Sequence, residues 1–145
     1  MRWDDVMVPT QLPEVVDLIS YERVVMNAGT TWDYVPWHYN PQYAKDHGHP
    51  TIFVNTMHLA GFVDRIATDF GGPYSRVVRR RVSLLGSIYA GDSMVGRGSV
   101  VGKRIDTAGD TPRYLVDLEV SIFNQRDELC CPAEVTVELP AACPR

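Results

Sequence analysis

The sequence contains no long hydrophobic run: nowhere does it approach the roughly 18 consecutive apolar residues of a membrane-spanning helix. It also has no excess of positive charge, because 14 Lys and Arg residues face 18 Asp and Glu residues for a net charge of -4. The longest basic run is Arg79-Arg80-Arg81. Binding to nucleic acid requires a broad positive surface that neutralises phosphates. We therefore expect neither a membrane nor a nucleic acid as a partner.

Cysteine is also scarce, and the residues present do not have metal-binding spacing. The three cysteines are Cys130, Cys131 and Cys143. They form no Cys-x-x-Cys pair, and His47 and His49 have no third ligand of the right type nearby, so we expect no metal site. An odd number of thiols suits the reducing cytoplasm, and no apolar signal-peptide segment follows Met1–Asp5. The composition thus indicates a cytoplasmic location.

The length and the apolar content are those of one globular domain. A chain of 145 residues that is 45% hydrophobic can bury a core without disulfides or a metal. We expect a single domain across the whole chain, with residues 1–13 as an N-terminal arm. Residues 14–19 resemble a short strand. Ser20 is a suitable N-cap for a helix over residues 21–28, which Gly29 would end.

The most informative segment for the fold is Ile52–Phe70, which is apolar on nearly every side. Its charged residues are Asp64, Arg65 and Asp69. A helix that is apolar nearly all round is a buried helix. Asn55 or Thr56 can cap its start, and Gly71-Gly72-Pro73 ends it. We predict that this helix forms the centre of the core.

Four strand-like segments follow this helix. They are Arg76–Tyr89, Ser93–Asp106, Tyr114–Ile122 and Leu129–Leu139, with a turn at Asn124–Glu128 before the last. In the second segment, Gly96, Gly98 and Gly102 share one face, which indicates that the helix approaches that face closely. A buried helix followed by half-buried antiparallel strands predicts the α+β class. The sheet is expected to curl around the helix, which is the arrangement of the hot-dog fold.

The candidate catalytic residues are Asp33 and His38, which lie five positions apart in a loop-like segment. A carboxylate and an imidazole that converge on one water can remove a proton from it and return a proton to the product. Pro36 between them stiffens the loop. The alternative is structural, with His38 as a hydrogen-bonded core residue and Asp33 as a turn former. Spacing alone leaves both interpretations open.

Several segments together resemble the MaoC-like, or (R)-specific enoyl-CoA hydratase, family. That family's signature reads Gly-Asp-x-Asn-Pro-x-His, followed by a His-Gly-Met helix start. This chain has Asp33-Tyr34-Val35-Pro36-Trp37-His38 and, later, Asn55-Thr56-Met57. Residues 87–92 are similar to the family's Val-Tyr-Pro-Gly-Asp strand end, and residues 124–126 to its hairpin turn. The resemblance covers nearly the whole chain.

The resemblance implies a function and gives residues a role in it. Asp33 and His38 fall on the family's catalytic pair. Asn55, Thr56 and Met57 fall on the helix start, whose backbone N–H groups bind the thioester oxygen as it gains negative charge. The implied reaction is hydration of a trans-2-enoyl-CoA to a 3-hydroxyacyl-CoA, or the reverse dehydration. Coenzyme A would enter as part of the acyl-CoA substrate, with no separate cofactor.

A narrower resemblance concerns the substrate and the partner. With Asn55 in place of the usual His and Val35 in place of Asn, the chain is similar to the small MaoC-like subunit of actinobacterial steroid side-chain hydratases. That group implies a steroid or other bulky acyl-CoA and a larger MaoC-like partner chain; the alternative partner is a second copy. Aromatic residues around the candidate site favour an interface or an acyl-binding wall. They are Tyr34, Trp37, Tyr39 and Tyr43.

Two other functions remain open. A hot-dog thioesterase would use the same helix start with a lone carboxylate and a water; His38 argues against it, and release of free thiol distinguishes it. A non-catalytic or half-catalytic subunit of a heteromeric complex is indicated by the departures at Val35 and Thr56. Elsewhere, His58 is expected to be structural or pocket-lining. The three arginines at 79–81 form a solvated face or interface ion pairs, or contact the phosphates of coenzyme A.

Overall fold

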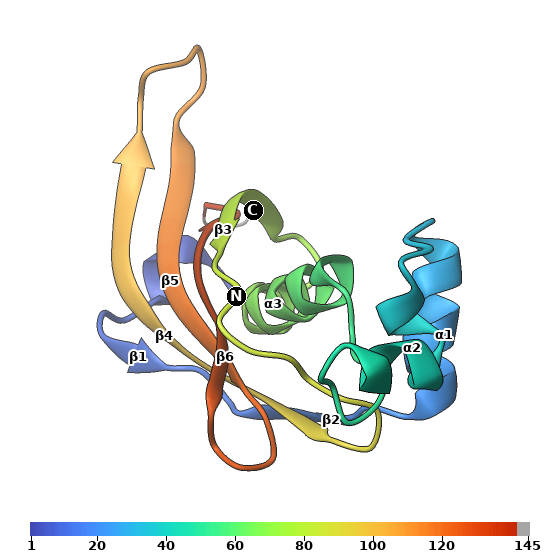
Figure 1. The fold of residues 1–145 in the computed structure, drawn as a ribbon. Helices are drawn as coiled ribbons and strands as arrows, with labels where there is room; N and C mark the ends of the chain where they lie inside the picture. The colour runs from blue at the N-terminus through green and yellow to red at the C-terminus, as the bar shows by residue number, and fades with distance from the viewer. Residues whose placement is uncertain (142–145) are drawn as a thin grey trace.

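The computed structural model of the chain describes residues 1–141, where six strands form one antiparallel sheet that curls around a central helix, α3 (Thr56–Gly71) (Figure 1). The strands are β1 (Thr10–Gln11), β2 (Val15–Leu18), β3 (Arg76–Val82), β4 (Ser93–Asp106), β5 (Arg113–Phe123) and β6 (Leu129–Glu138). Their order is β1-β4-β5-β6-β3, and β2 also pairs with β4. The predicted α+β class and hot-dog arrangement are confirmed. Within residues 1–141, no helix is both long and apolar enough to cross a membrane.

The helix α3 supplies much of the core. Its buried residues are Leu59, Ala60, Phe62, Val63, Ile66, Ala67 and Gly71. Of the two predicted caps, Asn55 is the one used, because its Oδ1 accepts a hydrogen bond from the N–H of His58 at 3.0 Å. The apolar residues 52–54 therefore lie outside the helix. They run extended beside residues 88–90, where the N–H of Val54 donates to the carbonyl of Ile88 at 3.0 Å.

On the glycine-rich face of β4, α3 packs closely against one glycine, Gly96. A Cβ built on Gly96 would lie 2.9 Å from the ring of Phe62 and closer still to Ile66, both on α3. The prediction that Gly98 also faces the helix is wrong, since its neighbours are Leu12 and the adjoining strand β5. The predicted shared face does not extend to Gly102 either. A bulge in β4 between Val100 and Gly102 shifts the register of pairing with β5.

The predicted strand over residues 76–89 is wrong in its second half. β3 ends at Val82; Ser83, Leu85 and Gly86 still donate hydrogen bonds to carbonyls of β6, and the chain then leaves the sheet. Within β3 the expected alternation holds: Arg80 reaches α3, where it pairs with Asp64, while Arg79 and Arg81 line shallow hollows on the outer face of the sheet. The chain after Val82 is thus available to line a site beside the helix.

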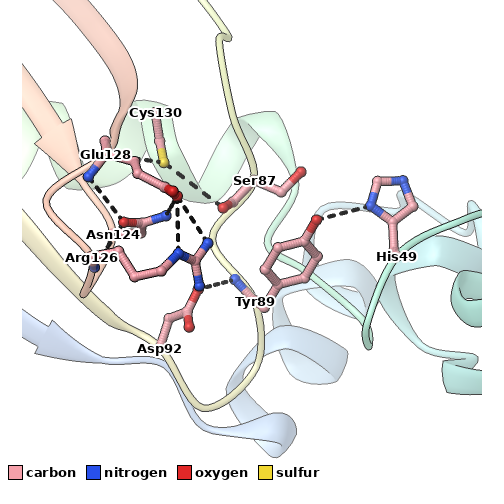
Figure 2. Close-up of polar contacts among 8 residues, drawn as sticks. All are labelled: His49, Ser87, Tyr89, Asp92, Asn124, Arg126, Glu128 and Cys130. Carbon is pink, nitrogen blue, oxygen red and sulfur yellow. Dashed lines mark hydrogen bonds and ion pairs between the residues drawn. The ribbon is translucent and has the colours of Figure 1, made fainter.

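The turn between β5 and β6 holds that segment in place (Figure 2). The side-chain oxygen of Asn124 accepts hydrogen bonds from the N–H groups of Arg126 and Glu128, at 2.9 and 3.1 Å, which closes the predicted turn. Asp92 lies beside it and accepts from the N–H of Tyr89 at 2.9 Å. The Tyr89 hydroxyl lies 3.1 Å from Nδ1 of His49. The hairpin is joined to this segment through Cys130, whose Sγ donates to the carbonyl of Ser87 at 3.8 Å and whose carbonyl accepts from the N–H of Leu85 at 2.9 Å.

The N-terminal part packs onto the sheet. The predicted arm, residues 1–13, contains a short 3-10 helix, η1 (Trp3–Asp5), and β1, and Trp3 donates from its indole to the carbonyl of Leu115 at 3.0 Å. The helix α1 (Tyr21–Thr30) has the predicted cap, Ser20, but continues through Gly29. Two short helices follow, η2 (Pro36–His38) and α2 (Pro41–Asp46). In Figure 1, α1 and α2 lie on the side of α3 away from β4, β5 and β6.

Candidate active site

Asp33 is positioned by the way α1 ends. The N–H of Asp33 donates to the carbonyl of Ala28 at 3.0 Å, and the N–H of Trp32 donates to that of Gly29 at 3.4 Å. These two bonds form a Schellman motif, in which the residue after the cap adopts a left-handed conformation. Here that residue is Trp32, with φ +56°. The helix therefore ends at Thr30, with Trp32 rather than Gly29 as the left-handed residue that stops it, and Asp33 follows at a fixed place.

His38 is held by a backbone carbonyl that comes from the segment before α3. Its Nδ1 lies 2.7 Å from the carbonyl oxygen of Phe53. A carbonyl can only accept, so Nδ1 carries the proton, and in the neutral ring Nε2 carries a lone pair. Nε2 lies 3.5 Å from Oδ2 of Asp33. The His38 side chain is 9% exposed and that of Asp33 is 30% exposed. The structure thus brings the two predicted residues together.

The pair has a defined chemical capacity. With a neutral ring, Nε2 of His38 and the carboxylate of Asp33 are both acceptors, and a water that donates one hydrogen to each satisfies both. Such a water is oriented for deprotonation by either group. When the ring is protonated, Nε2 instead donates to Asp33, and the pair can return that proton. General acid and general base chemistry on one water is therefore open to this pair.

The start of α3 lies next to this pair, and its three candidate residues differ in what they offer. The Asn55 side chain is fully engaged, because it caps α3 and its Nδ2 donates to Oγ1 of Thr31 at 2.8 Å. Thr56 and Met57 are exposed and lie in the first turn, where a helix leaves its N–H groups without internal acceptors. Within residues 1–141 no acceptor takes these two N–H groups. The positive end of the helix dipole adds to their attraction for an anionic oxygen.

A cavity of about 250 Å³ opens at this point. It is lined by Trp37, His38, Phe53, Val54, Asn55, Thr56, Leu59, Leu84, Gly86 and Ser87. The catalytic candidate His38 and the helix start thus share one apolar pocket. Met57 is not among its walls and instead lines a second, larger hollow between α1 and α3.

Some of these residues were not foreseen from the sequence. Phe53 acts through its carbonyl group, for which a side-chain pattern gives no signal. In a helix that included Phe53, Met57 four residues later would take that carbonyl; because α3 begins at Thr56, the carbonyl remains available to His38. Leu84 and Ser87 were placed in a strand, so their position on the cavity wall was missed.

Aromatic side chains surround the pair, in two groups. Trp37 stacks on Phe53 with ring centroids 6.3 Å apart and also contacts Tyr43. Tyr34 packs edge-on against Trp32 at 6.0 Å, and these two side chains are 58% and 80% exposed. The first group is therefore a wall of the site, and the second is an exposed apolar surface beside Asp33.

The other reactive groups have structural partners. Nδ1 of His47 lies 2.8 Å from the carbonyl of Tyr43, and Nδ1 of His49 lies 3.1 Å from the hydroxyl of Tyr89. Burial raises the pKa of Cys130 and of Cys131, so both remain thiols at neutral pH. Cys143 lies outside the described residues. Across residues 1–141, no three His, Cys, Asp or Glu side chains come together as metal ligands.

Comparisons with known proteins identify the family and the fold of the chain. Residues 9–119 match the model of a protein family whose description is "MaoC like domain". No curated protein matches the sequence. Among solved structures, the ChsH1-ChsH2 complex from Mycobacterium tuberculosis is 25% identical, over 92% of this chain and 98% of that chain, with a TM-score of 0.80. The (R)-hydratase from A. caviae involved in PHA biosynthesis is 22% identical, over 94% and 98% of the two chains, with a TM-score of 0.82. R-hydratase PhaJ1 from Pseudomonas aeruginosa is 16% identical, over 97% and 86%, with a TM-score of 0.84.

Proposed function

Because the chain belongs to the family of MaoC-like domains, we propose that it hydrates a trans-2-enoyl-CoA to a 3-hydroxyacyl-CoA or catalyses the reverse dehydration. One observation carries the proposal. Nε2 of His38 lies 3.5 Å from Oδ2 of Asp33, while the carbonyl of Phe53 holds the other ring nitrogen, Nδ1. A thioesterase needs one carboxylate and a water, whereas this site pairs the carboxylate with an oriented imidazole.

In the hydration direction, a water held between Asp33 and His38 attacks C3 of the enoyl group. One member of the pair accepts a proton from the water as the C3–O bond forms. The same proton then passes through the pair to C2, to which the electron pair of the double bond has moved, and forms the new C2–H bond. The elements of one water are thus added across C2 and C3, and proton exchange restores the pair.

The start of α3 stabilises the charge that develops during this step. As water adds to C3, negative charge moves onto the thioester oxygen and forms an enolate. The backbone N–H groups of Thr56 and Met57 are free to donate to this oxygen, because they lie in the first turn of the helix. The positive end of the helix dipole lies at the same place and attracts the negative charge. An N–H donor aimed at such an oxygen contributes about 10²–10³-fold in rate. Asn55 does not donate to the oxygen; its side chain caps the helix and thereby fixes the position of the first turn.

The proposed substrate is a bulky acyl-CoA, such as one that carries a steroid ring system. Coenzyme A is part of that substrate, and the proposal includes no separate cofactor. The proposed partner is a second hot-dog chain, either a second copy or a larger MaoC-like chain. The exposed aromatic surface of Trp32 and Tyr34, next to Asp33, supports a site that is completed at a subunit boundary.

The test is a hydration assay on trans-2-butenoyl-CoA and a bulky enoyl-CoA, with the chain alone and mixed with a larger MaoC-like chain. We expect Asp33→Asn and His38→Gln each to lower turnover by about 10²–10⁴-fold, because each removes half of one proton relay. Circular dichroism should match the unsubstituted protein. Near-normal turnover in either variant would show that the residue is not catalytic.

The same assay distinguishes the alternative functions. Release of free coenzyme A thiol without hydration would identify a thioesterase. Absence of both activities in the chain alone and in the mixture would identify a binding subunit.

A further inference from the structure

The groups of the candidate site are carried by two separate parts of the chain. Asp33 directly follows α1, and its N–H is held by a backbone hydrogen bond to that helix at 3.0 Å. The start of α3 carries the N–H groups of Thr56 and Met57, which have no acceptor within residues 1–141. The carbonyl of Phe53, just before α3, lies 2.7 Å from Nδ1 of His38. The carboxylate therefore belongs to the end of α1 and the other groups to the start of α3, and chemistry on one substrate requires a fixed distance between these two parts.

The side chain of Thr31 joins the two parts by a hydrogen bond to each. Its Oγ1 donates to the carbonyl of Asn27 on α1 at 2.7 Å and accepts from Nδ2 of Asn55 at 2.8 Å. Asn55 in turn caps α3, since its Oδ1 accepts from the N–H of His58 at 3.0 Å. Three hydrogen bonds in series thus run from the last turn of α1 into the first turn of α3. Within residues 1–141, no other hydrogen bond joins the end of α1 to the start of α3.

Loss of the Thr31 hydroxyl affects Asn55 more than it affects α1. The carbonyl of Asn27 also accepts from the N–H of Thr31 and from Oγ1 of Thr30, each at 3.0 Å, so α1 keeps its end. Nδ2 of Asn55, by contrast, has no second acceptor within the described part of the chain. Asn55 is 3% exposed, and a buried amide donor is unfavourable without a partner. The amide would therefore turn toward another acceptor, and its cap on the first turn of α3 would loosen.

We propose that Thr31 is a positioning residue, whose hydroxyl keeps the start of α3 in place relative to Asp33. The proposal rests on the proposed function, because the enolate oxygen defines where the N–H groups of the first turn must lie. Thr31 does not line the catalytic cavity, so it acts through Asn55 and not on the substrate. A misplacement of about 1 Å can lower a rate by about 10²-fold, so the loss of one hydrogen bond at this place is enough to impair catalysis.

The test compares three substitutions that differ by single hydrogen bonds. Thr31→Val removes the hydroxyl and keeps the branched shape, whereas Thr31→Ser keeps the hydroxyl. Thr30→Val is the matched control, because Oγ1 of Thr30 donates to the same Asn27 carbonyl but has no hydrogen bond to Asn55. Each protein is assayed in the form, alone or mixed with a larger MaoC-like chain, in which the unsubstituted protein hydrates trans-2-butenoyl-CoA.

We expect Thr31→Val to lower kcat by about 10–10²-fold and to change KM by less than about threefold, because the displaced N–H groups act mainly in the transition state. Thr31→Ser and Thr30→Val should keep near-normal kcat. A merely structural role would instead lower the melting temperatures of Thr31→Val and Thr30→Val alike and leave kcat unchanged below them. Near-normal kcat in Thr31→Val, or an equal loss in Thr30→Val, would overturn the proposal.

A second background tests whether Thr31 acts through Asn55. Serine is as good a helix cap as asparagine, but its shorter side chain carries no amide donor for Thr31. Asn55→Ser should therefore lower kcat to a similar degree as Thr31→Val, and the addition of Thr31→Val to it should cause no further loss. Losses that multiply would show that Thr31 acts by another route and would overturn the proposal.

Nuclear magnetic resonance provides a measurement that does not depend on turnover. In the absence of substrate, relaxation dispersion of the amide signals of Thr56, Met57 and His58 reports motion of the first turn of α3 on the μs–ms timescale. Thr31→Val should introduce this motion, whereas Thr31→Ser and Thr30→Val should not. Unchanged relaxation in Thr31→Val would overturn the proposal. The expected relaxation pattern in a protein that hydrates no enoyl-CoA would instead overturn the proposed function alone, because the positioning of the α3 start is measured without it.

Discussion

At the scale of single residues, Trp32 occupies a backbone conformation that favours glycine. Its φ is +56°, and its side chain is 80% exposed, so little packing compensates for the strain. A left-handed conformation costs a non-glycine residue about 1–2 kcal/mol. Strain of this kind persists at functional sites. Trp32 lies directly before Asp33 and contributes to the exposed aromatic surface, which is consistent with such a role.

We therefore predict that Trp32→Gly raises the free energy of unfolding by up to about 1 kcal/mol, after the greater unfolded-chain freedom of glycine is included. Urea denaturation measures this change. Trp32→Ala is the control, because it removes the ring but keeps the strained conformation, and it should show no gain. If Trp32→Gly is less stable than Trp32→Ala, the strain argument is wrong.

The sequence identifies the residue types at the site but not all of their partners. Asp33, His38 and the cap Asn55 were identifiable because their chemistry belongs to their side chains. Phe53 was not, because its contribution is a carbonyl that becomes available only when the helix begins at Thr56. His58, expected to be structural or pocket-lining, does line the hollow that Met57 lines. Arg23 joins the same hollow only through the packing of α1 beside α3, which depends on the tertiary structure.

At the scale of elements, the contact between β4 and α3 depends on Gly96. A Cβ there would lie closer to α3 than side chains tolerate. We predict that Gly96→Val destabilises the protein by at least about 1–3 kcal/mol, the usual cost of overpacking a core. Gly102→Val, in the same strand, is the control, since its added Cβ would meet nothing nearer than Asp117 at 3.8 Å. Thermal unfolding compares the two, and equal melting temperatures would show that α3 does not pack on Gly96.

The element boundaries show why the sequence prediction succeeded for some strands and failed for others. The bounds of Ser93–Asp106 were predicted as they occur, and its buried residues, Met94, Gly96 and Val100, all lie at even positions. Residues 83–89 were assigned to a strand as the end of a β-branched and basic segment that stops at Ala90-Gly91-Asp92. In the structure, Ser83 and Leu85 hydrogen-bond to β6 residues, but the chain then crosses toward the cavity. A local pattern does not indicate where a strand leaves its sheet.

At the scale of the whole molecule, an apolar surface lies beside the catalytic pair. Trp32, Tyr34, Val35 and Tyr39 are exposed by 80%, 58%, 40% and 41%. Trp32 and Tyr34 pack against each other, and exposed apolar side chains that cluster in this way mark an interaction site. We predict that light scattering shows a dimer or larger assembly of the chain, alone or with a larger MaoC-like chain. Tyr34→Asp should dissociate it and lower hydration, because a buried charge opposes association.

Tyr74→Asp provides the control for that experiment. Tyr74 is 84% exposed and follows α3, away from the site residues in the sequence. Its substitution should leave the assembly and the activity unchanged. A clean monomer with full activity would contradict a site completed at a subunit boundary.

The central claim is that Asp33 and His38 act together on one water, and a double-mutant cycle tests it most directly. Hydration of trans-2-butenoyl-CoA is measured for the unsubstituted protein, Asp33→Asn, His38→Gln and the double variant. Groups that act as a unit are strongly non-additive. The account predicts that the double variant is no slower than the slower single variant. Losses that multiply, so that the double variant falls by the product of the two single effects, would show that the two residues act on separate steps and would contradict the account.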